Sequence, residues 1–159
     1  MRTGPTTPAT TALTRAGVAF TGHPYEHDPS TANFGIEAAE ALGVEAERVF
    51  KTLLAEVDDD LVVGIVPVTT RLNLKALAAA VGAKRAVLAD PATAERRTGY
   101  VVGGISPIGQ KMRHRTVLDE TAELFDSVFV SGGRRGFDIE LSTADLIRVT
   151  GAIVADITR

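Results

Sequence analysis

The feature that most constrains the fold is a pair of apolar segments separated by a short acidic turn. Residues 49–57 and 61–68 are rich in Val, Leu and Ile, and Asp58-Asp59-Asp60 lies between them. Two such segments on either side of a turn predict an antiparallel β-hairpin. A second hairpin is predicted for residues 127–131 and 137–141, around the turn Gly132-Gly133-Arg134-Arg135-Gly136. The chain must therefore build at least part of its sheet from antiparallel pairs.

Short helical segments alternate with the predicted strands. Capping residues, prolines and glycines place helices at 7–16, 36–42, 73–81, 90–97 and after the capping-box pattern Ser142-Thr143-Ala144-Asp145. Further strands are predicted at 18–26, 86–89, 115–118 and 152–157, with a turn at 28–31. This mixture predicts an α+β fold with a mixed sheet that can curl, and not a purely parallel one. We expect residues 1–159 to form a single domain.

Composition excludes several classes of function. Apolar residues make up 45% of the 159 residues and charged residues 23%, as in ordinary folded proteins. The chain has no cysteine, so it has no disulfide, thiolate nucleophile or cysteine-bound metal. No stretch approaches the ~20 apolar residues of a membrane helix, and a cytoplasmic location is expected. The formal net charge of −3 favours weak, local contact with any nucleic acid.

Lys51 is the most informative single residue. Alternate residues of a strand share a face, which groups Lys51 with Val49, Leu53, Ala55 and Val57. A lysine on an apolar face is uncommon, and burial disfavours its charged form. The side chain either lies in a reactive site or extends its ammonium group to water at the end of the strand. The pattern alone leaves these two interpretations equal.

The glycine-rich segment Gly103–Lys111 resembles two motifs without matching either. A phosphate-binding P-loop needs Lys directly after its last glycine, but Gln110 intervenes. An esterase nucleophile motif needs one residue fewer, and Pro107 has no amide hydrogen, so Ser106 is a poor nucleophile candidate. The backbone amides of Gly103, Gly104 and Ile105 could bind a carbonyl oxygen or a phosphate. A tight crossover that requires glycine geometry is an equal alternative.

The histidines do not form a convincing metal site. In a strand, His23 and His27 would lie about 13 Å apart, at ~3.3 Å per residue, which is too far for one ion. We therefore expect neither a metal nor another cofactor. Tyr25 is expected to line a pocket or the core, whereas strand alternation predicts that Asp138 faces water. Basic clusters at 111–115 and 134–135 could contact phosphates, although such clusters are usually solvated.

Five segments together resemble the YbaK/EbsC family, and within it the Cys-tRNA(Pro)/Cys-tRNA(Cys) deacylases. They are His23-Pro-Tyr-Glu-His-Asp28, Phe34-Gly-Ile-Glu-Ala-Ala-Glu40, Val49-Phe-Lys-Thr-Leu-Leu54, the loop Thr98–Lys111 and the hairpin segment Val130–Leu141. The loop is long and specific, and the resemblance covers nearly the whole chain. It implies a mixed, barrel-like sheet flanked by helices, similar to the editing domain of bacterial prolyl-tRNA synthetases.

The resemblance also implies a site and a reaction. Lys51 becomes the key residue, and the same pocket is formed by Tyr25, Phe34, Thr52, Gly103, Gly104, Ile105, Ser131 and Asp138. Proline and cysteine are similar in size, and a pocket separates such pairs by only ~1–3 kcal/mol, so a second site that removes the error is useful. The family resemblance implies that the substrate's own thiol attacks its carbonyl, and that prolyl-tRNA synthetase is a partner.

Three functions remain open at this level. The first is a Cys-tRNA deacylase, which could also act on Cys-tRNA(Cys). The second is a deacylase for another mischarged residue, such as Ala-tRNA(Pro), in which water attacks. The third is a non-catalytic module that binds aminoacyl-tRNA or a nucleotide.

Overall fold

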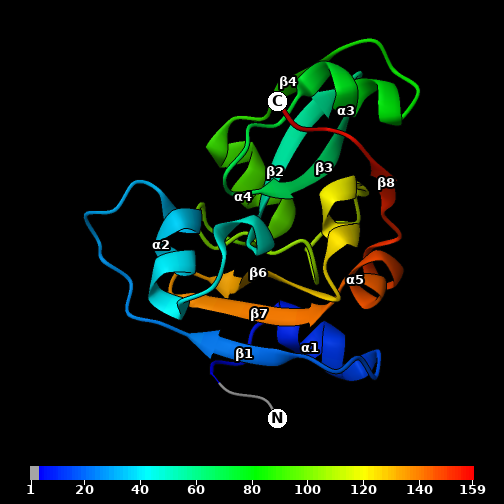
Figure 1. The fold of residues 1–159 in the computed structure, drawn as a ribbon. Coiled ribbons are helices and arrows are strands. Elements are labelled where there is room, and N and C mark those ends of the chain that lie inside the picture. Colours follow the sequence, from blue (N-terminus) through cyan, green and yellow to red (C-terminus); the bar gives the residue numbers. More distant parts are fainter. Residues whose placement is uncertain (1–3) are drawn as a thin grey trace.

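The computed structural model describes residues 4–159, which fold into two β-sheets with helices around them (Figure 1). The strands of the smaller sheet have the order β1-β7-β6, and those of the larger sheet have the order β4-β2-β3-β5-β8. The strands are β1 (Thr21–Pro24), β2 (Phe50–Val57), β3 (Asp60–Pro67), β4 (Ala86–Leu88), β5 (Arg115–Asp119), β6 (Ser127–Arg134), β7 (Phe137–Ser142) and β8 (Ile153–Ala155). The helices are α1 (Pro8–Arg15), α2 (Phe34–Leu42), α3 (Leu74–Ala80), α4 (Pro91–Thr98) and α5 (Thr143–Thr150), with 3₁₀ turns η1 (Ala46–Arg48) and η2 (Glu120–Leu124).

Both predicted hairpins are present, and the α+β class is confirmed. Strands β2 and β3 pair antiparallel from Phe50↔Pro67 to Val57↔Asp60, around a turn in which Asp58 has a positive φ of 57°. Strands β6 and β7 form the second hairpin, which extends further than expected and contains a register shift between Ser131 and Arg134. Strand β3 then pairs parallel with β5, so the larger sheet is mixed, as expected.

The expected barrel is not closed. The two sheets are separate ladders, linked by the isolated parallel bridge Val49↔Phe129 between the start of β2 and β6. The main core lies between the sheets and is formed by side chains such as Leu54, Ile65 and Leu118 from one sheet and Val130 and Ile139 from the other. The hydrophobic effect is satisfied by this stacking, so closure of the hydrogen-bonded ladder is unnecessary.

Helix α3 covers the outer face of the larger sheet. Its Leu77 and Ala78 pack with Val62, Val66 and Val117 in a second apolar cluster. Because β3 is central and covered on both faces, every residue from Leu61 to Val68 is buried. Among residues 4–159, no helix has the length and apolar character needed to cross a membrane.

Side-chain caps set the ends of the helices. Asn33 accepts a hydrogen bond from the Ile36 amide, so α2 begins at Phe34, two residues earlier than predicted. Ser142 caps α5 in the same way through the Asp145 amide. Strand β1 is shorter than the predicted 18–26 and covers Thr21–Pro24 at the edge of its sheet, where a proline is tolerated.

Candidate functional site

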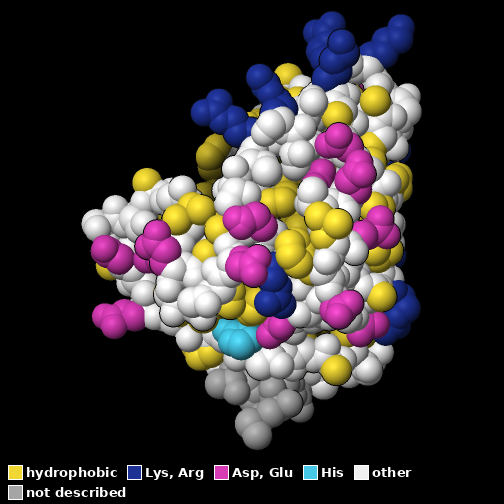
Figure 2. All heavy atoms as spheres, viewed as in Figure 1, with side chains coloured by type: hydrophobic (Ala, Val, Ile, Leu, Met, Phe, Trp, Pro, Cys, Tyr) yellow, Lys and Arg dark blue, Asp and Glu magenta, His cyan; other side chains and the backbone are white. Residues whose placement is uncertain are grey.

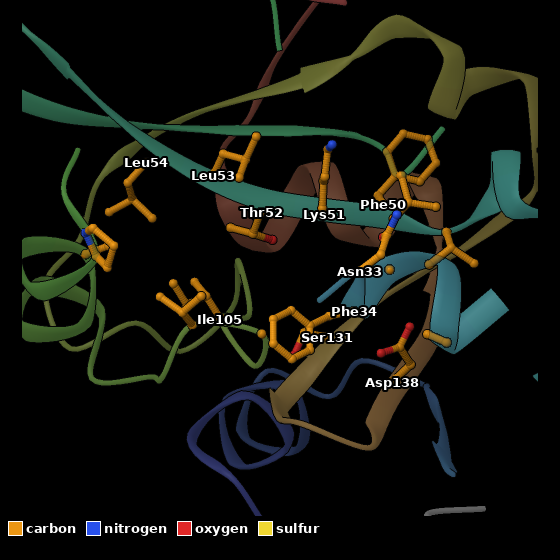
Figure 3. A pocket seen from close by; sticks show the side chains of 18 of the residues that line it. Asn33, Phe34, Phe50, Lys51, Thr52, Leu53, Leu54, Ile105, Ser131 and Asp138 are labelled. Atoms are coloured by element: carbon orange, nitrogen blue, oxygen red, sulfur yellow. The ribbon is translucent and has the colours of Figure 1, made fainter. Parts of the chain in front are cut away.

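A cavity of about 590 Å³ lies where β2, α2, the loop after α4 and the β6–β7 hairpin meet (Figure 3). Its lining is mainly apolar, with side chains such as Val49, Leu53, Leu54 and Val68. Eight of the nine predicted site residues line this cavity. They are Tyr25, Phe34, Lys51, Thr52, Gly103, Ile105, Ser131 and Asp138. Segments separated by more than a hundred residues are therefore brought together at one place.

Lys51 lines the cavity, but its side chain extends from the side of β2 opposite to Ser131 and Asp138. Figure 3 shows Lys51 and Leu53 extending from one side of β2, whereas Ser131 and Asp138 lie on the other side, with Thr52. Within residues 4–159, the Lys51 ammonium group has no hydrogen bond or ion pair. Burial, and then the charge of Arg71, hold the pKa of Lys51 below its usual value. The predicted site lysine is thus partly buried, unpaired and available to an anion.

The backbone groups of Thr52 lie on an edge of β2 that no neighbouring strand covers. The Val68 amide donates to the Val49 carbonyl, and antiparallel ladders alternate, so the backbone groups of Lys51 and Leu53 face β3. Those of Thr52 therefore face the opposite edge, which β4 does not cover because it pairs only from Ala55 onward. The Thr52 hydroxyl is buried and has no partner among the described residues. An unpartnered buried hydroxyl is costly, which favours a ligand as its partner.

Asp138 is buried, contrary to the prediction from strand alternation. The side chain is only 6% exposed, because β7 is the central strand of its sheet and its second face is covered by α2 and η1. Burial raises the pKa of Asp138 to about 7. Burial and then the nearby Asp138 also raise the pKa of Tyr25. The position implied by the family resemblance is the one observed, and the carboxyl group lines the cavity without forming an ion pair among the described residues.

Gly103 and Gly104 occupy different environments in the glycine-rich loop. Gly103 lines the cavity with φ +90°, and a Cβ there would lie 2.9 Å from the Phe34 ring. Gly104 lies outside the lining: its amide donates to the Val101 carbonyl, and a Cβ would lie 2.7 Å from Arg134 Cα. Among the described residues, no acceptor binds the amides of Gly103 and Ile105. Those two amides, and not the Gly104 amide, are free for a ligand.

Phe34 and Arg135 form part of the cavity's border. The Arg135 guanidinium lies 4.9 Å from the centre of the Phe34 ring and donates from Nε to the Val102 carbonyl. Arg135, for which the sequence left open either a phosphate contact or a solvated position, is therefore held beside the site. Sequence analysis missed Asn33, which also lines the cavity. Its position as the residue that caps α2 was the available signal.

The histidines and Ser106 have structural partners. His23 Nε2 lies 3.1 Å from a Glu140 carboxylate oxygen, and His27 Nδ1 lies 2.8 Å from Glu37. In the part of the chain that the structure describes, no group of three or more His, Cys, Asp or Glu side chains could hold a metal. Ser106 is fully buried, accepts a hydrogen bond from the Ile108 amide, and does not line the cavity.

Comparisons with known proteins identify the family of this chain. The sequence model of the aminoacyl-tRNA editing domain matches residues 28–149. The chain is 40% identical over 121 residues to the "Putative Cys-tRNA(Pro)/Cys-tRNA(Cys) deacylase EbsC" of Enterococcus faecalis, covering 76% of this chain and 74% of that protein. It is 33% identical over 89 residues to the "Multifunctional Ser/Thr-tRNA deacylase ProXp-y" of Escherichia coli K12, covering 55% and 53% of the two chains.

A solved structure supports the same assignment. A protein described as "a putative trans-editing enzyme for prolyl tRNA synthetase" superimposes with a TM-score of 0.82 at 25% identity, covering 98% of this chain and 99% of that chain. The YbaK/EbsC resemblance is thereby confirmed. From the match over most of its length, the chain belongs to the aminoacyl-tRNA editing domain family of deacylases.

Proposed function

We propose that this deacylase removes cysteine from mischarged Cys-tRNA(Pro), and that it also accepts Cys-tRNA(Cys). The similarity to EbsC supports the choice of substrate. A cavity of about 590 Å³ with a mainly apolar lining suits a small amino acid and its terminal adenosine. We also propose that residues 1–159 fold as a single editing domain.

The chemistry of the cavity's hydroxyl groups supports attack by the substrate. The Ser131 hydroxyl accepts a hydrogen bond from the Gly133 amide, and the Thr52 hydroxyl has no base beside it among the described residues. A protein nucleophile requires an adjacent base, whereas a thiol has a pKa near ~8.5 and ionises readily. The substrate sulfur would form a bond to its own carbonyl carbon while the ester C–O bond breaks. The thiol proton passes to the ribose oxygen, which releases tRNA and a cyclic thioester.

Four further polar groups of the cavity would each have a partner on such a substrate. Asp138 is the only carboxylate in the described lining, and we assign it to the α-ammonium group. The amides of Gly103 and Ile105 would bind the carbonyl oxygen, where negative charge develops. Lys51, on the opposite side of β2 and beside the charge of Arg71, would bind a phosphate of the acceptor end.

A substrate panel on a single transfer RNA tests the proposal. Cys-, Ala-, Ser- and Pro-tRNA(Pro) are incubated with the protein, together with Cys-tRNA(Pro) whose sulfur has been methylated. We expect rapid loss of cysteine alone and no loss of the methylated form, which differs by one methyl group on the attacking atom. Equal rates for both cysteine forms would reject attack by the thiol.

A second candidate is hydrolysis of a different mischarged amino acid by water. The 33% identity to ProXp-y, a protein named for action on Ser- and Thr-tRNA, favours it. Loss of serine or alanine in the panel at a rate equal to or above that of cysteine would select this function. Tight binding of aminoacyl-tRNA without loss of any amino acid would instead indicate a non-catalytic module.

We further propose that prolyl-tRNA synthetase delivers the substrate. With a net charge of −3, the protein has no global attraction to RNA, so few phosphates can be engaged. We expect weak binding of tRNA by the isolated protein, and equal affinity for Cys-tRNA(Pro) and Cys-tRNA(Cys). A complex with the synthetase would raise the local concentration of the mischarged product.

A salt titration of binding, with and without the synthetase, checks this expectation. Each phosphate contact contributes about −0.7 to −0.9 to the slope of log affinity against log salt concentration. A shallow slope that corresponds to a few contacts is expected for the protein alone. Tight binding by the isolated protein, with preference for one of the two transfer RNAs, would contradict the proposed delivery.

A further inference from the structure

Two arginines far apart in the sequence lie directly opposite each other in a short ladder that begins after β3. Leu72 and Thr158 form an isolated antiparallel bridge, and the Arg159 amide donates to the Arg71 carbonyl at 2.9 Å. The Asn73 amide donates to the Ile157 carbonyl and completes the same short ladder. In this register Arg71 is paired with Arg159, and side chains of such a pair extend to the same side.

This pairing of like charges is unfavourable unless an anion lies between them. Cross-strand pairs of opposite charge stabilise a sheet, and pairs of like charge directly opposite each other destabilise it. Both side chains are exposed, and across residues 4–159 neither forms an ion pair. Two exposed guanidinium groups on the same side of a ladder can bind one phosphate together.

Arg71 lies near the cavity, although it is not part of the lining. Arg71 follows the end of β3, only three residues after Val68, which lines the cavity together with Lys51. The charge of Arg71 is felt at the Lys51 ammonium group. A polyanion whose end enters the cavity would therefore pass Lys51 first and the arginine pair next.

Further cations extend this surface. Figure 2 shows Lys and Arg side chains gathered at the end of the molecule where Figure 1 places α3 and the C-terminal residue. The exposed side chains Lys75, Lys84 and Arg85 belong to α3 and to the segment between α3 and β4, and none has an ion pair within the described chain. We define the basic end as Arg71, Lys75, Lys84, Arg85 and Arg159. It concentrates positive charge on a protein whose net charge is negative.

We propose that the basic end is the docking surface for the phosphate backbone of the tRNA acceptor stem, with Arg71 and Arg159 as its anchor next to the cavity. This inference deepens the proposed function, because it assumes that an acceptor end enters the cavity. RNA is favoured over an acidic protein because the surface is contiguous with the site of a tRNA-editing family. It replaces the clusters at 111–115 and 134–135 as the principal phosphate contacts.

The test measures binding of an uncharged RNA hairpin that copies the acceptor stem and ends in CCA. Fluorescence anisotropy is recorded across a salt series for the wild-type protein, Arg71→Ala, Arg159→Ala and the double variant. We expect each single substitution to lower the magnitude of the salt slope by about 0.7–0.9, and the double substitution to lower it by about twice that amount. Because no amino acid is attached, binding is measured independently of deacylation.

Two control variants make the result specific. Arg15→Ala removes an exposed arginine of α1, at the opposite end of the molecule (Figure 1), and is expected to leave the slope unchanged. Arg113→Ala tests the competing cluster at 111–115. An unchanged slope in the Arg71 and Arg159 variants, or a larger change in Arg113→Ala, would overturn the proposal. A slope change as expected in a protein that deacylates no substrate would leave the docking surface valid and reject the proposed function alone.

Thermal unfolding measurements show whether each variant is folded. Removing one member of an unfavourable like-charge pair is expected to leave the melting temperature unchanged or raise it. If Arg71→Ala does not fold, Arg71→Gln and the salt slope of Arg159→Ala provide the same test. A variant of normal stability with a normal slope would again contradict the docking surface.

Discussion

Replacing Lys51 with alanine is expected to lower kcat/KM for Cys-tRNA(Pro) by about 10²–10³-fold, the cost of removing one oriented donor at a charged centre. The Lys51 ammonium group has no protein partner in the described structure, so its loss should not break an existing ion pair. Removal of a partly buried charge should also leave stability nearly unchanged. The deacylation rate and the melting temperature, measured on the same preparation, check both parts of this prediction.

A second substitution separates the charge of Lys51 from its packing. Lys51→Met retains an unbranched stem along β2 but lacks the ammonium group, and it should lose as much activity as Lys51→Ala. Lys51→Arg retains the charge and should recover part of the activity on tRNA. A folded neutral variant that retains more than about a tenth of wild-type activity would contradict this prediction. Such a small loss does not fit the removal of an oriented donor, and Lys51 would then not be the key residue of the site.

Replacing Asp138 with asparagine is expected to remove a loss of folding free energy, of several kcal/mol, that the wild-type protein undergoes as the pH rises. Burial raises the pKa of Asp138 from 3.8 to about 7. As pH rises above about 4, the unfolded chain releases the Asp138 proton first, while the folded protein retains it until about pH 7. This carboxyl group therefore lowers the stability of the wild-type protein progressively between about pH 4 and 7, and by a constant amount above that range.

The expected size follows from the two pKa values. A rise from 3.8 to about 7 corresponds to an upper value of ~4 kcal/mol, at ~1.4 kcal/mol for each tenfold change in proton affinity. The asparagine side chain cannot ionise, so the variant should gain this amount relative to wild type between about pH 3.5 and about pH 8. Urea unfolding of both proteins at the two pH values gives the difference, in which all other titrating groups cancel. A stability difference that is the same at both pH values would contradict the assignment.

The same variant tests the role proposed for Asp138 in binding. An α-ammonium group would supply the cation that the described cavity lining does not place beside this carboxyl group, and its charge would favour the ionised carboxylate. Asp138→Asn should therefore weaken the use of Cys-tRNA(Pro) even though it stabilises the protein at about pH 8. Full activity in a stabilised variant would show that the substrate's amino group binds elsewhere.

Local patterns in the sequence predicted the helices and strands, but not the bounds of β1, α2 and β8 or the two 3₁₀ turns. The apolar runs on either side of Asp58–Asp60 predicted β2 and β3 correctly, because hairpin formation depends on adjacent residues. The caps Asn73, Asp90 and Ser142 predicted the starts of α3, α4 and α5, since a cap acts within one helical turn. The motif segments were enough to recognise the family, and the structure gathers eight of nine proposed site residues around one cavity.

Long-range packing decided what the sequence left open or predicted wrongly. Alternation placed Asp138 in water, but the position of β7 at the centre of a covered sheet buries it. Gly104 was grouped with Gly103, yet contact with the Arg134 backbone removes it from the cavity lining. Arg71 and Arg159 gave no signal as isolated charges far apart in the sequence. They meet only because the last residues of the chain pair with the segment after β3, a contact that depends on the tertiary fold and not on local pattern.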